Sequence, residues 1–137
     1  MKNIYPVIFT KTENEILVEV PDLEILTQGI DMINAIEMAR DAIGLKVITL
    51  EDEELEIPMP SDLEKINLED STFAHEGKPV LSLVDIDFFE YRRQHDNKSV
   101  RRNVTLPNWL NQAAEKANLN VSKVLQEALK EKLNIER

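Results

Sequence analysis

The pair Asp85 and Asp87 is the feature of this chain that most resembles a catalytic metal site. The two residues alternate within the apolar segment 80–87, so on a β-strand their carboxylates face the same side. In nucleases, paired carboxylates hold the magnesium ions that assist phosphodiester cleavage. No further carboxylate is identifiable as completing such a site, and we therefore expect no catalysis from this pair.

The other candidate metal ligands are an acidic run and two histidines. Residues 51–56 read EDEELE, without the organised spacing of a calcium loop. His75 and His95 both lie in polar sequence, and the chain has no cysteine. We expect these side chains to be solvated, with no metal and no cofactor bound.

Charge is divided unevenly along the chain. The net charge of −10 taken alone argues against nucleic-acid binding. Residues 1–97, however, hold 8 basic and 22 acidic residues, a balance of −14, whereas residues 98–137 hold 8 and 4, a balance of +4. This asymmetry predicts an acidic segment for a basic partner and a basic tail for phosphate.

Length and composition bound the class of protein. The 137 residues suffice for one small domain and a tail that completes its core by dimerising, and a hydrophobic fraction of 42% supports a packed core. The absence of cysteine fits a reducing cytosol. Polar residues interrupt the N-terminal apolar run too early for a signal peptide, and no segment approaches the roughly 20 apolar residues of a membrane span. We expect a cytoplasmic protein without membrane contact.

The first 98 residues read as a small α+β unit. Strands are predicted over 4–9 and 16–20, followed by a loop and a helix from Asp31, a good N-cap, to the low 50s. Ser61 begins a capping-box pattern that favours a short helix, and residues 80–87 form a strong strand signal. Residues 88–98 become increasingly polar, which is typical of a linker or a short helix.

Residues 99–137 read as strand, helix, turn and helix. A strand over 99–106 ends at Pro107, which suits the first turn of a helix running to about Asn118. Asn118 can adopt a left-handed conformation, and Asn120 is placed to cap the last helix. One copy cannot be stable alone, because a lone strand leaves its backbone groups unpaired. Pairing the strands of two chains gives an antiparallel ribbon of the kind that fits the major groove of DNA.

Strand alternation then assigns residues to the two sides of this ribbon. Arg101, Asn103 and Thr105 share the outward side and are predicted to contact bases. Asn120, Ser122 and Lys123 begin the last helix, whose N-terminus favours a phosphate. The predicted dimer core comprises Val104, Leu106, Trp109, Leu110, Val124, Leu125 and Leu129.

The tail resembles the ribbon-helix-helix tail of HicB-type antitoxins. These share the pattern V-x-x-N-V-T-L-P, matched here by VRRNVTLP, followed by N-x-S-x-x-L-x-x-A-L, which falls on residues 120–129. The segments YPVIFT, EVPDLEILTQGID, AIEMARDAIGL and IPMPSD are similar to the HicB sheet domain. Glu24-Ile25 departs from the family, in which many members have a Pro-Gly turn.

The resemblance implies a fold and partners, and no catalysis. It implies a partial ribonuclease-H-like unit of βββα type over residues 1–90, a linker over 91–98, and a βαα ribbon-helix-helix domain over 99–137. The first unit is expected to bind HicA, a small basic mRNA interferase toxin. The tail is expected to form a homodimer, or a higher oligomer, and to repress its own operon by binding operator DNA. The residues proposed for toxin binding are Tyr5, Asp22, Leu23, Glu24 and Gly29.

Three alternatives stay open. The acidic unit could sense a metal or small molecule in a repressor without a toxin partner, although the usual His and Cys ligands are lacking. The chain could be an enzyme of ribonuclease-H type, which a magnesium-dependent cleavage assay would reveal. The tail could serve only to assemble a dimer.

Overall fold

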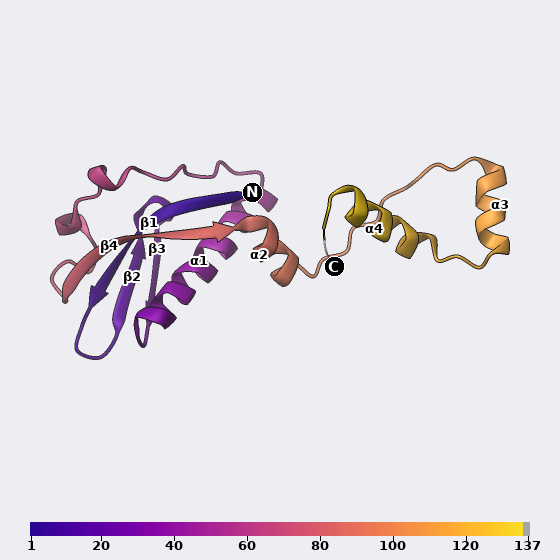
Figure 1. Cartoon of the computed structure of the whole chain (residues 1–137). Coiled ribbons are helices and arrows are strands. Elements are labelled where there is room, and N and C mark those ends of the chain that lie inside the picture. Colours follow the sequence, from indigo (N-terminus) through magenta and orange to yellow (C-terminus); the bar gives the residue numbers. More distant parts are fainter. Residues whose placement is uncertain (136–137) are drawn as a thin grey trace. The chain divides into compact units, whose positions relative to one another are not determined.

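A computed structural model of the chain describes residues 1–135. The chain divides into two compact units, and the second begins at Ser99. No helix in the described part is long and apolar enough to cross a bilayer. The first unit is mixed α and β, and the second contains two helices (Figure 1).

The first unit is built on a four-stranded antiparallel sheet in the order β3-β2-β1-β4. Its strands are β1 (Lys2–Lys11), β2 (Ile16–Val20), β3 (Ile25–Gly29) and β4 (Lys78–Asp87). The local sequence patterns predicted a loop between the second strand and Asp31, but residues 25–29 form β3, so three strands precede the first helix. A turn of 3-10 helix, η1 (Pro21–Leu23), and the left-handed Glu24 (φ 54°) reverse the chain, so that Val20 pairs with Ile25.

Helix α1 (Met32–Asp52) packs against one face of this sheet (Figure 1). It begins as predicted, because the side chain of Asp31 accepts a hydrogen bond from the Asn34 N–H at 2.8 Å. The residues of the shared core alternate along the strands and recur at helical spacing in α1. They include Tyr5, Val7, Phe9, Val18, Val20, Ala35, Ala39, Ile43, Val47, Val84 and Ile86.

The linker predicted over residues 91–98 is shorter than expected, because 91–95 belong to helix α2 (Phe88–His95). This helix packs on α1, and Arg92 pairs there with Glu51 at 2.6 Å and Asp52 at 3.1 Å. The Tyr91 hydroxyl donates to Asp41 at 3.0 Å. Partial burial and this bond raise the pKa of Tyr91 to about 12.

Gly44 allows α2 to approach α1 closely. A Cβ atom at this position would lie 2.5 Å from a ring carbon of Tyr91. We expect Gly44→Ala to destabilise the protein by about 1–3 kcal/mol through overpacking, although the same change in an exposed helix gains about 1 kcal/mol. Urea unfolding checks this, with Tyr91→Ala as the control background. If Gly44→Ala is stabilising in the natural background, the contact is not as described.

The segment between α1 and β4 lacks long elements and is tied to the sheet by side chains. The helix predicted after Ser61 is only a turn, η2 (Leu63–Lys65), followed by a second turn, η3 (Leu68–Asp70). The Tyr5 hydroxyl donates to the Pro58 carbonyl at 2.8 Å. The carboxylate of Glu19 accepts from the Ser71 hydroxyl at 2.7 Å and from the Thr72 N–H at 3.0 Å. These bonds hold the segment against the sheet.

The second unit contains α3 (Asn108–Lys116) and α4 (Val121–Lys132). The predicted turn is confirmed, since Asn118 has φ 55° and the side chain of Asn120 accepts from the Lys123 N–H at 3.1 Å. Residues 99–106 form no strand in the single chain. A strand needs a partner for its backbone groups, and the described part of this chain supplies none there.

Candidate nucleic-acid and protein interfaces

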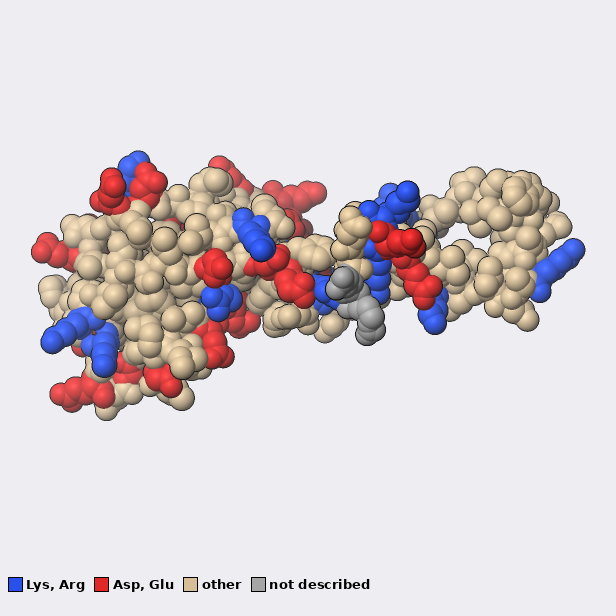
Figure 2. Space-filling view, viewed as in Figure 1, with Lys and Arg blue, Asp and Glu red and all other residues tan. Residues whose placement is uncertain are grey.

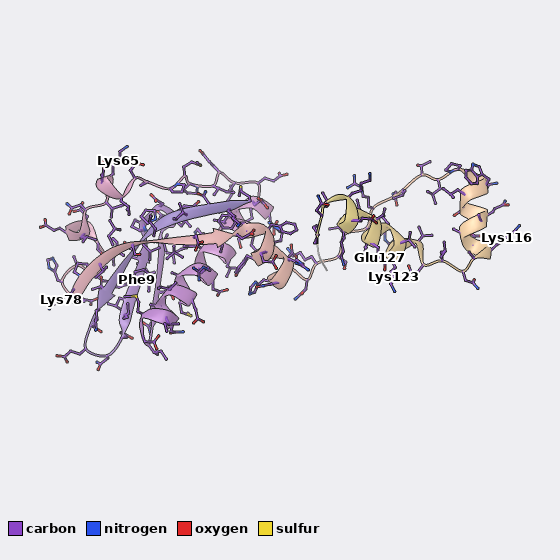
Figure 3. All side chains as sticks on the ribbon, in the orientation of Figure 1. Phe9, Lys65, Lys78, Lys116, Lys123 and Glu127 are labelled. Atoms are coloured by element: carbon purple, nitrogen blue, oxygen red, sulfur yellow. The ribbon has the colours of Figure 1, made fainter. Side chains whose placement is uncertain are left out.

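The N-terminus of α4 brings together the three residues predicted to contact phosphate. Asn120 caps the helix with its side chain, so the Lys123 N–H already has an acceptor. The N–H groups of Val121 and Ser122 precede that of Val124, which is the first to donate to a helical carbonyl, that of Asn120, so they point out of the helix end. In Figure 3, Lys123 lies on the first turn of α4. This end therefore combines open amide donors, a positive helix dipole and a lysine, which together suit an anion.

The residues predicted to contact bases lie on the extended segment that precedes α3. Arg101, Asn103 and Thr105 are all exposed. The beginning of the segment and one face of α4 enclose a hollow of about 600 Å³. Its lining comprises Ser99, Val100, Arg101, Arg102, Ser122, Leu125, Gln126 and Leu129. Arg101 thus lies beside α4 in the single chain, whereas Asn103 and Thr105 do not line the hollow.

The tail exposes the apolar residues that were predicted to form a dimer core. Trp109 is 72% exposed and Val104 is 54% exposed. Leu106, Leu110, Val124 and Leu129 are also exposed, and Leu125 is half-buried. No described side chain from 99 to 135 is fully buried. Apolar surface on this scale is what a partner normally covers.

The five residues proposed for toxin contact do not form one exposed surface. Tyr5, Leu23 and Gly29 are buried, so the prediction that they contact a partner directly is not supported by their exposure. Tyr5 and Leu23 fill the core, and a Cβ on Gly29 would lie 2.5 Å from the backbone of Ala35.

Asp22 and Glu24 differ from those three residues. Asp22 is half-buried, and its carboxylate accepts from the N–H of Ser61 at 2.9 Å and from the Ser61 hydroxyl. Glu24 is exposed at the left-handed turn between β2 and β3. Of the five residues, only Glu24 has an exposed side chain.

The two units carry different charge on their surfaces. Figure 2 shows acidic side chains spread over the first unit, and several basic ones on the second. Because the acidic residues come from strands, helices and turns, the negative field covers much of the unit rather than one point. Such a surface attracts a basic partner over distances of about 10 Å at physiological salt.

Three of the residues considered as metal ligands, Asp85, Asp87 and His95, have structural partners. Asp85 pairs with Arg40 at 3.1 Å, and Asp87 caps α2 by accepting from the Glu90 N–H at 3.1 Å. His95 stacks on Tyr91 with ring centroids 4.2 Å apart. Within residues 1–135, no three His, Asp or Glu side chains are grouped as metal ligands.

Two features that shape the surface of the first unit were not predicted from the sequence. Leu26 lies on β3 and is 55% exposed. Arg40 reaches from α1 to the backbone of β4, where its Nε donates to the Asp85 carbonyl at 3.0 Å. The helical spacing of α1 could identify Arg40 as a surface residue, but only the folded sheet brings Asp85 to it.

The fold and these surfaces define a two-unit protein in which an acidic α+β unit precedes a helical tail with an exposed apolar face. The chain matches the family described as HicB_like antitoxin of bacterial toxin-antitoxin system over residues 5–130. It belongs to this family.

Solved structures support the same assignment. A chain of a toxin-antitoxin complex from Streptococcus pneumoniae is 26% identical with a TM-score of 0.61, and the match covers 96% of this chain and 99% of that one. The antitoxin HicB of Burkholderia pseudomallei is 25% identical with a TM-score of 0.51, covering 96% of each chain. A chain of a HicA3 and HicB3 complex is 25% identical with a TM-score of 0.51, covering 62% of this chain and 99% of that one. A comparison with curated proteins found no match.

Proposed function

We propose that this antitoxin neutralises a HicA-type mRNA interferase toxin through its first unit and represses its own operon through its tail. The observation that carries the proposal is the charge division between the two units, −14 before residue 98 and +4 from there on. An acidic surface suits a toxin that must itself bind RNA, and a basic tail suits operator DNA. The similarity to a chain of the HicA3 and HicB3 complex supports the choice of toxin.

On the first unit, we place the toxin near the turn between β2 and β3. Glu24 is exposed there, and Leu26 presents an apolar side chain two residues later. Asp22 fixes the neighbouring segment by binding Ser61, so this surface is held in place before a partner arrives. The strand order β1-β2-β3 followed by α1 supports a partial ribonuclease-H-like unit.

On the tail, we infer a ribbon-helix-helix homodimer. The unpaired segment 99–106 of each chain supplies one strand of the ribbon, and the exposed apolar residues of α3 and α4 form the common core. Arg101, Asn103 and Thr105 then face the bases, while the N-terminus of α4 holds a phosphate. A dimer engages two half-sites of one operator, which strengthens binding through avidity.

The toxin half is tested by measuring the affinity of the full chain for the HicA-type toxin by calorimetry. We expect Glu24→Lys to weaken binding about tenfold, because it reverses a charge at the contact. Since lysine and glutamate have the same Cβ geometry, the left-handed turn carries the same strain in both. The matched control is Glu13→Lys in the exposed turn between β1 and β2.

We also expect the affinity to fall as salt is raised, because the two partners carry opposite charge. Absence of any binding by the folded chain would overturn the toxin half. Equal weakening by Glu24→Lys and Glu13→Lys would overturn the location but not the partner.

A further inference from the structure

Strand β4 ends the sheet, and its outer backbone edge is open. The Phe88 N–H donates to the Met1 carbonyl at 2.9 Å. Counting back from Phe88 in steps of two residues therefore gives the residues of β4 whose N–H and carbonyl groups point toward β1. Ser82, Val84 and Ile86 therefore exchange hydrogen bonds with β1. The residues between them direct their backbone groups outward. These outward residues are Pro79, Leu81, Leu83 and Asp85.

Only two outward backbone groups of this edge are unable to bond a further strand, and they lie toward its two ends. Pro79 has no N–H to offer, and the Asp85 carbonyl already accepts from Arg40 at 3.0 Å. Within residues 1–135, no hydrogen bond is found from the outer backbone groups of Leu81 and Leu83 to another part of the chain. Val80 is 52% exposed and Leu83 is 44% exposed. A long apolar edge of this kind is a template for another strand, and proteins normally cover it.

We propose that β4 pairs antiparallel with β4 of a second copy of this chain, about a two-fold axis at Ser82. In this register, Leu81 faces Leu83 of the second copy, and Pro79 faces Asp85 of the second copy. The two blocked positions are therefore opposite each other. The Asp85 carbonyl faces Pro79 of the second copy, which has no N–H to donate. This carbonyl does not need a donor from the second copy, because it already accepts from Arg40. The Asp85 N–H is left free to donate to the facing Pro79 carbonyl.

The side chains agree with this register. Leu81 and Leu83 lie on the sheet face turned away from α1, where the half-buried Leu81 of one copy would cover the exposed Leu83 of the other. Ser82 lies on the axis at a non-hydrogen-bonded pair, where facing Cα atoms are only about 4.5 Å apart and a small residue fits. Figure 3 places Lys78 at the end of β4 away from α2. Antiparallel pairing brings this positive end toward Asp85 and Asp87 of the second copy.

This pairing involves only the first unit and is independent of DNA binding by the tail. If the tail also dimerises, each chain carries two interfaces with copies of itself. The proposed toxin surface lies at the β2–β3 turn, whereas β3 and β4 occupy opposite edges of the sheet. The toxin contact and the β4 pairing therefore do not compete for the same edge.

A single cysteine tests the pairing, because the natural chain has none. In the full-length protein, Ser82→Cys brings two sulfur atoms to an axis where facing Cβ atoms suit a disulfide. We expect mild oxidation to link most of the protein into covalent dimers. The control is Leu26→Cys, an exposed position on the opposite edge strand of the same sheet. If Ser82→Cys forms disulfide-linked dimers no faster than Leu26→Cys, the proposal is overturned.

A second substitution, added to Ser82→Cys, identifies which molecule pairs with the outer edge of β4. In the Ser82→Cys background, Leu83→Lys should slow linkage at least tenfold by placing a charge against Leu81 of the second copy. Ile33→Lys, at a 73% exposed position on α1, should leave the rate unchanged. Circular dichroism verifies that both variants stay folded, as expected for exposed positions. If Leu83→Lys instead removes toxin binding and leaves linkage unchanged, a toxin strand occupies the edge and the self-pairing is wrong.

Discussion

The double variant Arg101→Ala, Asn103→Ala is expected to lose operator binding by on the order of 100-fold or more, since each bidentate base contact contributes about 1–3 kcal/mol of discrimination. The tail dimer should persist, because in the ribbon both side chains face away from Val104 and Leu106. Both residues are exposed and make no hydrogen bond with other side chains in the described structure. A gel shift at fixed salt, with sedimentation of the same samples, measures both properties.

Arg102→Ala is the matched control for this variant. Alternation turns Arg102 to the opposite side of the ribbon, so its loss removes charge without removing a base contact. We expect a modest decrease that depends on salt and is the same for operator and unrelated DNA. Operator affinity unchanged by the double variant would show that the ribbon does not read the bases.

The second large effect is expected from Leu125→Asp in α4. Leu125 is half-buried already in the single chain and faces the hollow beside residues 99–102. Losing a buried leucine costs about 2–5 kcal/mol, and the dimer loses one from each copy. We expect the tail to dissociate, so that Trp109 becomes solvated and its fluorescence emission moves to longer wavelength. Operator binding should fall with it, because a single tail engages only one half-site.

Lys130→Asp provides the control, since it introduces the same aspartate on the far side of α4. It should leave the Trp109 emission unchanged. The wild-type protein should itself show the long-wavelength emission on sufficient dilution. An emission maximum that is the same in Leu125→Asp and wild type at high concentration would argue that Trp109 is not part of a dimer core.

Local signals in the sequence predicted the helices well. Asp31 and Asn120 act as caps, and Asn118 takes the left-handed conformation, because each depends on the chemistry of one side chain and its nearest backbone. The acidic character of the first unit also follows directly from counting residues. These features need no knowledge of distant contacts.

Features that depend on distant contacts were missed. Residues 25–29 become a strand only because the turn at Glu24 returns them to β2, and their own alternation is weak. The sequence of residues 88–98 indicates either a linker or a short helix, and the choice is decided by Arg92, which pairs with Glu51 and Asp52 some 40 positions earlier. The burial of Tyr5 and Leu23 likewise follows from the sheet and not from their neighbours in sequence. The family resemblance marked their segments but could not say which side chains point outward.

The most direct test of the central claim is growth rescue. Cells expressing the HicA-type toxin are expected to stop growing, and co-expression of the full chain should restore growth. The Arg101→Ala, Asn103→Ala variant should rescue equally well when both proteins are expressed from unrelated promoters, because we place toxin binding and operator binding on different units. Growth arrest that persists in the presence of abundant, folded antitoxin would contradict the account.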